Sequence, residues 1–592
     1  MTSRERRCTE GLQARTVFVS PAMSLNDLLR ASRQLPGAGA FAGLPPFRIV
    51  LIAAFHLAAI AVMFFSEYGL VEKAVFLLTW ALLNCFFLML TRRPATAAAL
   101  SLSLIVALIV LSRLKHEVIW MTINFLDVMI VDTDTIQFLM TLFPNLWLML
   151  AIGFVASVPV FVLIWRRDSY RVRRRVAALG IVASLLGITG VSFAVPTETW
   201  EIFLPGSHIS KFARSGVESL TELYQHGFFE SDADVVGRLV APIGAVCPTT
   251  SKPPHIVLVH DESSFDIRAV PGVKVPENYG PHFKSFDGKQ RKFMVESNGG
   301  SSWFAEYNVL AGLSSRSYGR FSYFLTRVAA GRVERGLPRA LQRCGYHTYT
   351  LYPSLGAFMS ARGFHTSVGI EHFLDSKAMG TSRVEPDNFY FDKAADIIGQ
   401  QRGKGPLFMF VYLAANHYPW TDRWRPDLNT EWKDLGNPPK VDEYLRRQAM
   451  SADYYAAFVA RLKREFPGEQ FLIVRYGDHQ PELTANLIEP GAPDSVISQR
   501  MSTFDPRYFS TYYGVDALNF KPRNIGAALD TLDAPYLPLV VQQLAGLPLD
   551  ASFTEQKKIF ERCKGVYYGC SGGAESRRFN RLLIDAGLIK GL

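Results

Sequence analysis

Five long segments without Asp, Glu, Lys or Arg constrain the fold of this chain more than any other feature. They are Ile49–Phe65, Ala74–Leu90, Ala95–Ser112, Leu146–Trp165 and Val176–Val195. A helix needs about 20 mostly apolar residues to cross a bilayer core. One such segment could be a buried core helix, but five in succession with charged ends favour a membrane. We therefore predict a transmembrane domain over residues 49–195 with helices at 49–65, 74–90, 95–112, 146–165 and 176–195.

Basic residues are distributed unevenly among the loops between these segments. The tail 1–48 and the second and fourth loops contain 15 Lys and Arg residues, whereas the alternating loops contain only Lys73, Arg113 and Lys115. Short basic loops stay in the cytoplasm, so the odd-numbered helices run outward. Residues 1–48 then form a cytoplasmic tail, the first helix is an uncleaved signal anchor, and everything after Val195 lies outside the cytoplasmic membrane.

The net charge of +10 follows the same division of the chain. Residues 1–195 contain 18 basic and 10 acidic residues, so they carry +8 of this charge. The basic excess therefore belongs to the cytoplasmic loops, and we expect no nucleic-acid partner.

Two segments border the predicted membrane domain on its outer side. The loop Arg113–Asn145 mixes apolar runs with acidic residues, which favours short amphipathic helices on the outer leaflet, with a plain solvated loop as the alternative. Residues 196–253 contain an amphipathic run, Ser215–Tyr224, and are predicted to form a juxtamembrane connector.

From His255 onward, short β-rich apolar runs alternate with longer polar, helix-like stretches. The runs are His255–His260, Tyr349–Tyr352, Leu407–Leu413 and Phe471–Val474. Fully apolar strands with long crossovers are typical of a parallel sheet covered by helices on both faces. We therefore predict an α/β domain over residues 254–545 and a C-terminal tail over residues 546–592.

Chemically active residues directly follow three of these runs. Glu262 follows the first, His417 the third, and Asp478 with His479 the fourth. The site of an open α/β sheet lies at the carboxyl ends of its strands, and carboxylates with imidazole suit Zn²⁺ or Mn²⁺ and, less well, Mg²⁺. Each residue alone is more often a helix cap or a surface group. Together they predict one divalent metal ion (Mn, Zn or Mg).

A glycine-containing segment, Ser297–Tyr307, supplies the candidate nucleophile. Gly299 and Gly300 let the backbone approach a ligand closely, and the hydroxyl of Ser302 follows where a helix could begin. The helix N-terminus would then face an anion such as phosphate or sulfate. For this segment by itself, an ordinary turn with an N-cap serine is the alternative.

These motifs together resemble the sulfatase-like branch of the alkaline phosphatase superfamily. More narrowly, the chain resembles the membrane-bound phosphoglycerol transferases, which include lipoteichoic acid synthase and the periplasmic glucan phosphoglycerol transferases. The resemblance rests on Val257–Ser263, Gly299–Tyr307, Asn416–Pro419 and Gly477–His479. It implies a five-helix transmembrane domain followed by an α/β sulfatase-like domain with a mostly parallel central sheet. It also implies a multi-pass protein of the bacterial inner membrane with a periplasmic catalytic domain.

The resemblance implies a ligand set and a nucleophile. Glu262, Asp478 and His479 match the metal-ligand positions, and Ser302 matches the nucleophile that also touches the metal. The family commonly has threonine there, and serine supplies the same hydroxyl. The neighbouring Ser301 leaves a one-residue ambiguity in this assignment.

Further residues match positions around the substrate. Ser301 and Trp303 flank the candidate nucleophile and are expected to contact the substrate. His417 matches a histidine near the transferred phosphate, which makes it a candidate to protonate the leaving alkoxide. Arg362 resembles a phosphate-binding arginine, although its spacing to Gly369 is one residue short.

The same motifs favour one function within the superfamily. Phe304 and Glu306 stand where sulfatases that oxidise their nucleophile need Pro and Arg. Phosphoethanolamine transferases usually have Ser-Asp-His-Gly-Glu where this chain has Gly477–Pro481. We therefore expect transfer of phosphoglycerol from a membrane phospholipid, phosphatidylglycerol, to an envelope glycan through a phosphoserine intermediate. The alternatives are phosphoethanolamine transfer to lipid A or a glycan, hydrolysis of a phosphodiester or sulfuric ester, and a silent domain that senses envelope polymers.

Six cysteines in 592 residues exclude a disulfide-dense scaffold. Cys247, Cys344, Cys563 and Cys570 lie on the predicted outer side. Cys563 and Cys570 are close enough in sequence to close a local loop, while a Cys247–Cys344 pair and free thiols are equally compatible with the sequence.

Overall fold

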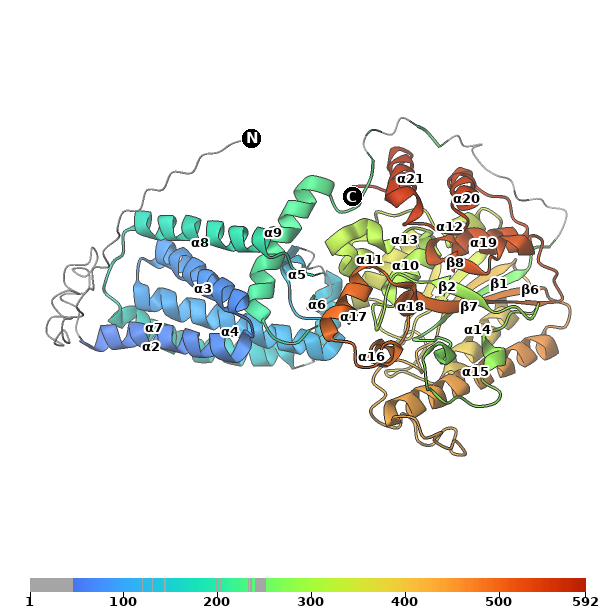
Figure 1. Cartoon of the computed structure of the whole chain (residues 1–592), viewed down its shortest axis with the longest axis horizontal. Helices are drawn as coiled ribbons and strands as arrows, with labels where there is room; N and C mark the ends of the chain where they lie inside the picture. The colour runs from blue at the N-terminus through green and yellow to red at the C-terminus, as the bar shows by residue number, and fades with distance from the viewer. Residues whose placement is uncertain are drawn as a thin grey trace, which may run out of the picture.

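A computed structural model describes residues 46–119, 121–129, 131, 133–142, 145–198, 201–202, 204–232, 234, 237–239, 247 and 252–591. In these residues a long helical bundle stands beside a larger α/β domain, which we call the outer domain (Figure 1). Most of the predicted tail 1–48 lies outside the described residues. The prediction of an apolar helical domain followed by an α/β domain is confirmed.

The bundle contains five long apolar helices at the predicted places. They are α2 (Pro46–Ser66), α3 (Leu70–Thr91), α4 (Pro94–Ile119), α7 (Leu146–Arg167) and α8 (Arg174–Ala194). All five are long and apolar enough to cross a membrane. Large apolar side chains remain exposed on the outer faces of the helices, including Phe154 at 70% and Leu186 at 68%. Such surfaces suit lipid rather than water.

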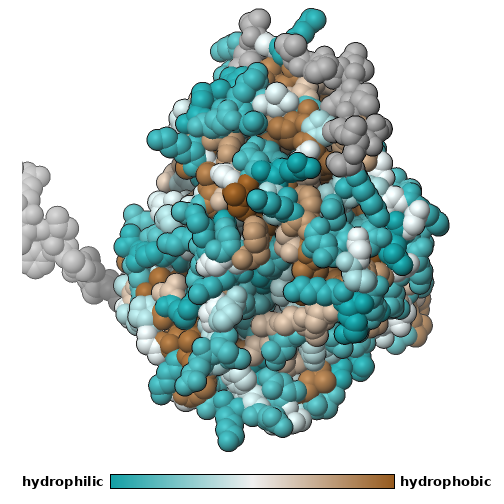
Figure 2. All heavy atoms as spheres, turned by 90° about the vertical axis from the view of Figure 1, so that its right-hand side faces the viewer, coloured by the Kyte–Doolittle hydropathy of each residue, from teal (hydrophilic) through white to brown (hydrophobic). Residues whose placement is uncertain are grey.

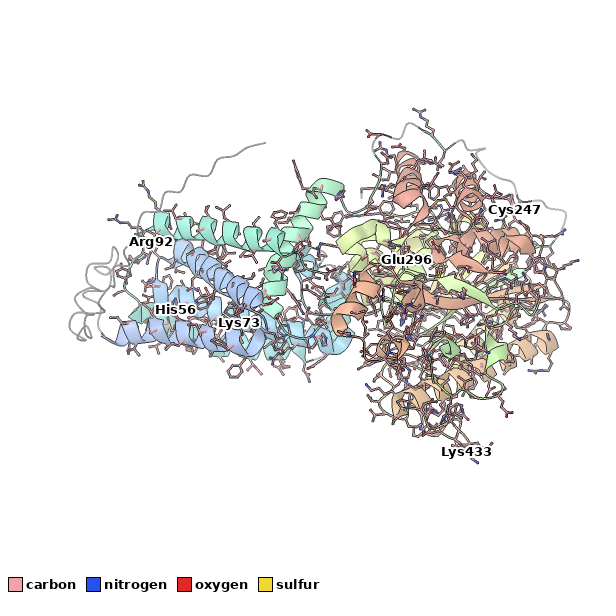
Figure 3. The ribbon with its side chains drawn as sticks, in the orientation of Figure 1. His56, Lys73, Arg92, Cys247, Glu296 and Lys433 are labelled. Atoms are coloured by element: carbon pink, nitrogen blue, oxygen red, sulfur yellow. A yellow bond between two sulfur atoms is a disulfide. The ribbon has the colours of Figure 1, made fainter. Side chains whose placement is uncertain are left out.

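The two ends of the bundle differ in what lies next to them. Arg92, between α3 and α4, lies at the end remote from the outer domain, whereas Lys73 lies nearer to it (Figure 3). The basic second loop and the outer domain are therefore at opposite ends of the bundle, as the predicted topology requires.

Three further helices join the bundle to the outer domain. Two of them, α5 (Phe125–Met129) and α6 (Thr133–Leu142), lie in the loop where short amphipathic helices are predicted, and α9 (His208–His226) contains the predicted amphipathic run. Leu126 of α5 is buried in the main core of the outer domain. Arg320 of the outer domain approaches Glu218 and Glu222 of α9 at 3.0 and 3.6 Å. Apolar packing and ion pairs therefore both hold the junction.

The outer domain is built on an eight-stranded sheet with the order β4-β3-β5-β1-β6-β7-β2-β8. The strands are β1 (His255–Asp261), β2 (Arg291–Met294), β3 (His347–Leu351), β4 (His372–Leu374), β5 (Leu407–Tyr412), β6 (Phe471–Gly477), β7 (Ser510–Leu518) and β8 (Thr531–Asp533). The four predicted strands are β1, β3, β5 and β6, which pair in parallel at the centre. β7 runs antiparallel to both β6 and β2, so the sheet is mixed but mostly parallel.

Helices cover both faces of the sheet, as the fully buried strands require. The α-helices of the outer domain are α10 (Trp303–Ala311), α11 (Leu325–Ala329), α12 (Leu337–Gln342), α13 (Ala361–Ser367), α14 (Asp387–Gln401), α15 (Pro439–Glu465), α16 (Ala485–Ile488), α17 (Asp494–Ser502), α18 (Pro506–Phe509), α19 (Leu537–Ala545), α20 (Ala551–Cys563) and α21 (Ala574–Asp585). Side chains of α10, α13 and α19 share one core with the sheet, and those of α14 and α15 share a second core. The face of the domain that points away from the bundle is largely hydrophilic (Figure 2).

Residues 546–592 are predicted to form a C-terminal tail. In the structure they pack into the outer domain. Phe553 of α20 and Phe579 of α21 are fully buried in the main core. Their rings lie beside the buried guanidinium of Arg335, 4.0 and 5.2 Å from its central carbon. The core of the domain therefore continues past residue 545, because these aromatic side chains fill space beside α10 and α19.

We expect Phe579→Ala to destabilise the outer domain by about 3–5 kcal/mol, because it leaves a cavity in a close-packed core. Thermal unfolding of the full chain in detergent, followed by circular dichroism, would show a clearly lower transition temperature. Glu561→Ala, at a 61% exposed side chain on α20, is the matched control and should leave the transition nearly unchanged. An unchanged transition in Phe579→Ala would contradict the packing of α21.

Both candidate cysteine pairs form disulfides. Cys563 joins Cys570 within the last part of the domain, and Cys247 joins Cys344 across 97 residues. Cys85 of α3 is free in the described part of the chain.

Candidate active site

The site forms where β1 and β6 end beside each other. These parallel strands are neighbours, and Asp261 is paired in register with Gly477. Glu262 and Asp478 follow directly, so the sheet delivers two carboxylates to one edge. Gly477 is required here because a Cβ on it would lie 1.8 Å from the carbonyl oxygen of Ser264. The two strand ends can therefore approach closely only with glycine at this position.

Ser302 reaches this edge from the start of α10. The preceding residues Gly299 and Ser301 have φ values of +67° and +63°, which turn the chain sharply into the helix. The Ser302 Oγ donates a hydrogen bond to Glu262 Oε2 at 3.0 Å and lies 3.2 Å from His479 Nε2. Its hydroxyl makes no N-cap hydrogen bond to the backbone of α10. The serine therefore interacts with the acidic cluster rather than with its own helix.

Asp478 is held by backbone donors. Its Oδ1 accepts hydrogen bonds from the backbone N–H groups of Ser263 at 2.7 Å and His479 at 2.8 Å. Its Oδ2 lies 3.3 Å from His479 Nε2, which is also 3.4 Å from Glu262 Oε1. The structure thus brings together all four sequence-predicted metal ligands, Glu262, Ser302, Asp478 and His479, and all are buried.

The charges of this cluster compensate one another through His479. Burial alone would lower the pKa of His479, but the carboxylates of Asp478 and Glu262 raise it to about 9. Burial favours the neutral form of Glu262, yet the hydrogen bond from His479 and the charge of His417 hold its pKa well below its usual range. In this state a proton on His479 neutralises part of the buried negative charge.

This donor set fits a divalent metal ion. Ligand atoms of His260, Glu262 and Asp478 lie within 4.8 Å of one another, and all three residues are buried. Two carboxylates with imidazole match the preferences of Zn²⁺ and Mn²⁺. A cation there would take the compensating role of the proton on His479, because ligation requires the neutral imidazole. Glu262, Asp478 and His479 are the residues that would hold it, with Ser302 Oγ beside them.

Sequence reasoning missed a set of aromatic and imidazole side chains behind the ligands. His260 Nδ1 is hydrogen-bonded to the Tyr476 hydroxyl at 2.7 Å, and its Nε2 lies 3.2 Å from Asp478 Oδ2. The Tyr412 hydroxyl donates to Glu262 Oε2 at 3.1 Å. Because both nitrogens of His260 have partners, we interpret it as the residue that orients Asp478. A histidine inside an apolar strand was the available signal in the sequence.

We expect His260→Gln to weaken metal binding by roughly 10–100-fold, the usual cost of losing a group that orients a metal ligand. The measurement is calorimetric titration of metal-free full-length protein with Mn²⁺ or Zn²⁺ at constant pH. His347→Gln, at a 42% exposed histidine on β3, is the control. Unchanged affinity in His260→Gln would contradict the orienting role.

Helix α10 is anchored one turn below Ser302. Glu306 Oε2 and His365 Nε2 are 2.8 Å apart, and His365 Nδ1 lies 3.1 Å from the Thr350 hydroxyl. All three residues are buried. This chain of contacts fixes the first turn of α10 against β3 and α13, and therefore fixes the position of Ser302.

The remaining predicted site residues lie around this cluster with other contacts. His417 is exposed after β5 and close enough for its charge to act on Glu262. The Trp303 indole N–H donates to the carbonyl oxygen of Tyr323 at 3.1 Å, so this hydrogen bond holds the ring in place. Ser301 is buried beside Ser302.

Arg362, the predicted phosphate-binding residue, has local partners. Its Nη2 donates to Asp375 at 2.6 Å and its Nη1 to the carbonyl oxygen of Phe373 at 3.0 Å. Nearly half of its side chain, 48%, is exposed. It is therefore not among the side chains gathered around Ser302, and its role in phosphate binding stays a prediction.

Comparison with known proteins finds one family model that matches part of the outer domain and several solved structures with low sequence identity. Residues 297–503 match the family model described as Sulfatase. A search of curated protein sequences finds no match. Lipoteichoic acid synthase from Listeria monocytogenes is 18% identical, with 56% of this chain and 78% of that chain covered and a TM-score of 0.38. Phosphoglycerol transferase from Streptococcus pyogenes, solved with sn-glycerol-1-phosphate, is 13% identical, with coverages of 59% and 89% and a TM-score of 0.44.

A third similar structure is that of an integral membrane protein. Lipooligosaccharide phosphoethanolamine transferase A from Neisseria meningitidis, an integral membrane protein, is 14% identical, with 81% of this chain and 96% of that chain covered and a TM-score of 0.41. The stretch of the outer domain that matches the Sulfatase family model, residues 297–503, includes the candidate nucleophile segment and the end of β6 with the candidate metal ligands Asp478 and His479.

Proposed function

We propose that this sulfatase-like membrane protein transfers phosphoglycerol from phosphatidylglycerol to a cell-envelope glycan, through a phosphoserine formed on Ser302. The observation that carries the proposal is the position of Ser302 Oγ, 3.0 Å from Glu262 and 3.2 Å from His479. A buried hydroxyl at a helix start, beside ligands for a divalent cation, is suited to attack phosphorus in an anionic ester.

The junction between the two domains supports a lipid donor. Trp303, next to Ser302, packs edge-on against Phe358 with ring centroids 6.0 Å apart. The turn Phe358–Ser360 in turn contacts α6. A continuous set of contacts thus leads from the apolar bundle to the candidate nucleophile. A phospholipid whose acyl chains stay beside the helices would have its head group near Ser302.

The first half of the reaction is a displacement at phosphorus. Ser302 Oγ bonds to the phosphorus of the lipid phosphodiester and releases its proton to solvent, while Glu262 Oε2 orients the hydroxyl through its hydrogen bond. The bond from phosphorus to the diacylglycerol oxygen breaks, and His417 gives that oxygen a proton. A divalent cation, when bound, neutralises charge on the phosphoryl oxygens and lowers the pKa of the serine hydroxyl.

The second half returns the side chains to their starting state. A hydroxyl of the glycan attacks the phosphorus of phosphoserine and gives its proton to His417, which is now neutral. The bond to Ser302 Oγ breaks, and that oxygen takes a proton from solvent. The products are diacylglycerol and a glycan that carries phosphoglycerol.

The proposal also implies on which side of the membrane the outer domain lies. The outer domain would stand on the outer face of the bacterial inner membrane, because the basic loops lie at the other end of the bundle. Phosphatidylglycerol in the outer leaflet and the glycan would then meet at one side of the membrane.

The proposal is tested by donor preference. Purified full-length protein in nanodiscs should consume labelled phosphatidylglycerol in preference to labelled phosphatidylethanolamine and release diacylglycerol in a metal-dependent reaction. Preferred use of phosphatidylethanolamine would identify phosphoethanolamine, and not phosphoglycerol, as the transferred group. Hydrolysis of sulfate esters with neither lipid used would overturn transfer altogether.

A further inference from the structure

A cleft of about 520 Å³ lies away from Ser302, between α15, the strands β6 and β7, and the chain around Gly280–Phe283. Its volume falls within the range of small-molecule sites. The cleft exists because small side chains line it, where larger ones would fill the space between helix and sheet. They are Ala449, Ala452 and Ala456, at the spacing of one face of α15, and Ala517 of β7.

The floor of the cleft contains a buried arginine whose donors are incompletely used. The side chain of Arg475 is 4% exposed, and its guanidinium lies 4.0 Å from the ring centroid of Tyr455. Its Nη1 donates to the carbonyl oxygen of His282 at 2.8 Å, but its contact with Asp516 is long, at 3.3 Å. Its Nε is buried and has no hydrogen-bond partner among the residues that the structure describes. Because Arg475 lines the cleft, this unused donor is a candidate partner for a ligand oxygen.

The charges of the cleft are nearly balanced. Three basic residues line it, Lys284, Lys463 and Arg475, and so do two acidic residues, Asp453 and Asp516. Because the deepest cation already faces a carboxylate, a strongly anionic ligand gains little here. A hydroxyl both donates and accepts hydrogen bonds, so it suits neighbouring carboxylate and guanidinium groups.

Apolar rings complete the walls of the cleft. Phe283 and Tyr455 are buried in its walls, and Phe286 at the lining is 49% exposed. Aromatic surface with a few placed polar groups is typical of sites for small organic ligands. A sugar ring presents apolar C–H faces and a rim of hydroxyl groups, and it fits this combination better than a lipid chain or a phosphate.

We propose that this cleft binds a saccharide segment of the envelope glycan, at a place separate from the reacting centre. The identity of the saccharide as the acceptor rests on the proposed function, whereas binding itself does not. The cleft is linked to the active site, because His282 at its wall lies 3.2 Å from Asp261, the residue before Glu262. If one segment of a glycan polymer binds in the cleft, the hydroxyl groups of its other segments are held at a higher local concentration around the domain.

The test is calorimetric titration of the full-length protein in detergent, without lipid donor. The probes are soluble oligosaccharides of glucose, galactose and N-acetylglucosamine, with inorganic phosphate and sn-glycerol-1-phosphate as anionic probes. Ala452→Phe fills the cleft, and Ala457→Phe places the same ring on an exposed position of α15 that does not line it. We expect an oligosaccharide to bind, with affinity at least roughly tenfold weaker in Ala452→Phe and unchanged in Ala457→Phe.

Hydrogen exchange on the wild-type protein keeps the test independent of the variant's folding. Bound oligosaccharide should slow exchange in residues 276–286 and 448–459. Absence of saccharide binding, equal binding by Ala452→Phe when that variant is folded, or protection by phosphate alone would each overturn the proposal. Diacylglycerol release by the wild-type protein is measured separately, so failure of the proposed function is distinguishable from failure of the cleft to bind.

Discussion

Ser302→Ala should lower diacylglycerol release from phosphatidylglycerol by at least about 10³-fold, because loss of a covalent nucleophile removes the main reaction path. The loss should be in chemistry rather than folding, since the hydroxyl makes no capping bond in α10. Of the two neighbouring serines, Ser302 is the one whose Oγ bonds to Glu262 and lies 3.2 Å from His479, so we do not expect Ser301 to substitute for it. The assay uses purified full-length protein in nanodiscs that contain fluorescent phosphatidylglycerol.

Two matched variants decide between the neighbouring serines. Ser301→Ala should keep most of the activity, and Ser302→Thr should keep a measurable part, since threonine supplies the same hydroxyl. In the wild-type protein, incubation with lipid in the absence of glycan should add the mass of phosphoglycerol to the peptide that contains Ser302. Full diacylglycerol release by Ser302→Ala would refute the mechanism.

Asp478→Asn should abolish both metal binding and transfer, with a rate loss of about 10³-fold or more. The amide replaces a fully buried carboxylate that accepts from two backbone N–H groups and lies beside His479. It removes a negative charge from the cation site. Its carbonyl oxygen can still accept the two backbone bonds, but its NH₂ group then stands at the position of Oδ2, where it cannot ligate a cation. Elemental analysis of purified protein should show metal content falling from about one ion per chain to near zero.

Asp392→Asn is the control for this prediction, because that aspartate is 59% exposed on α14 and pairs with Arg461. Metal should also stabilise the wild-type fold, so a chelator should lower its unfolding temperature and leave that of Asp478→Asn unchanged. Normal metal content in Asp478→Asn would show that the cation is held elsewhere.

The apolar bundle and the central strands could be predicted because their signals are local. Runs without charge over 17 or more residues define α2 to α4, α7 and α8, and buried parallel strands such as β5 consist of apolar residues throughout. The carboxyl ends of these strands then locate Glu262, Asp478 and His479 without any knowledge of packing.

The parts that sequence reasoning missed depend on contacts between distant segments. β7, Ser510–Leu518, is antiparallel beside β6 and contains Asp516 and Gly514, so it lacks an apolar run. The sequence of α20 and α21 favours a polar tail, because their few aromatic residues are separated by polar ones. Only the packing of the outer domain shows that these aromatic residues belong to its core. His260 and Tyr476 belong to different strands, 216 residues apart, so only their pairing in the sheet reveals the bond between them.

The Cys247–Cys344 disulfide encloses Glu262 and Ser302 within one covalent ring of the backbone. A single proteolytic cut anywhere in residues 248–343 therefore leaves the chain in one piece until a reductant is added. Nicked protein would migrate as intact on a non-reducing gel and as two fragments on a reducing gel. In preparations of this protein, comparison of the two gels therefore detects cleavage near Glu262 and Ser302 that a non-reducing gel alone does not show.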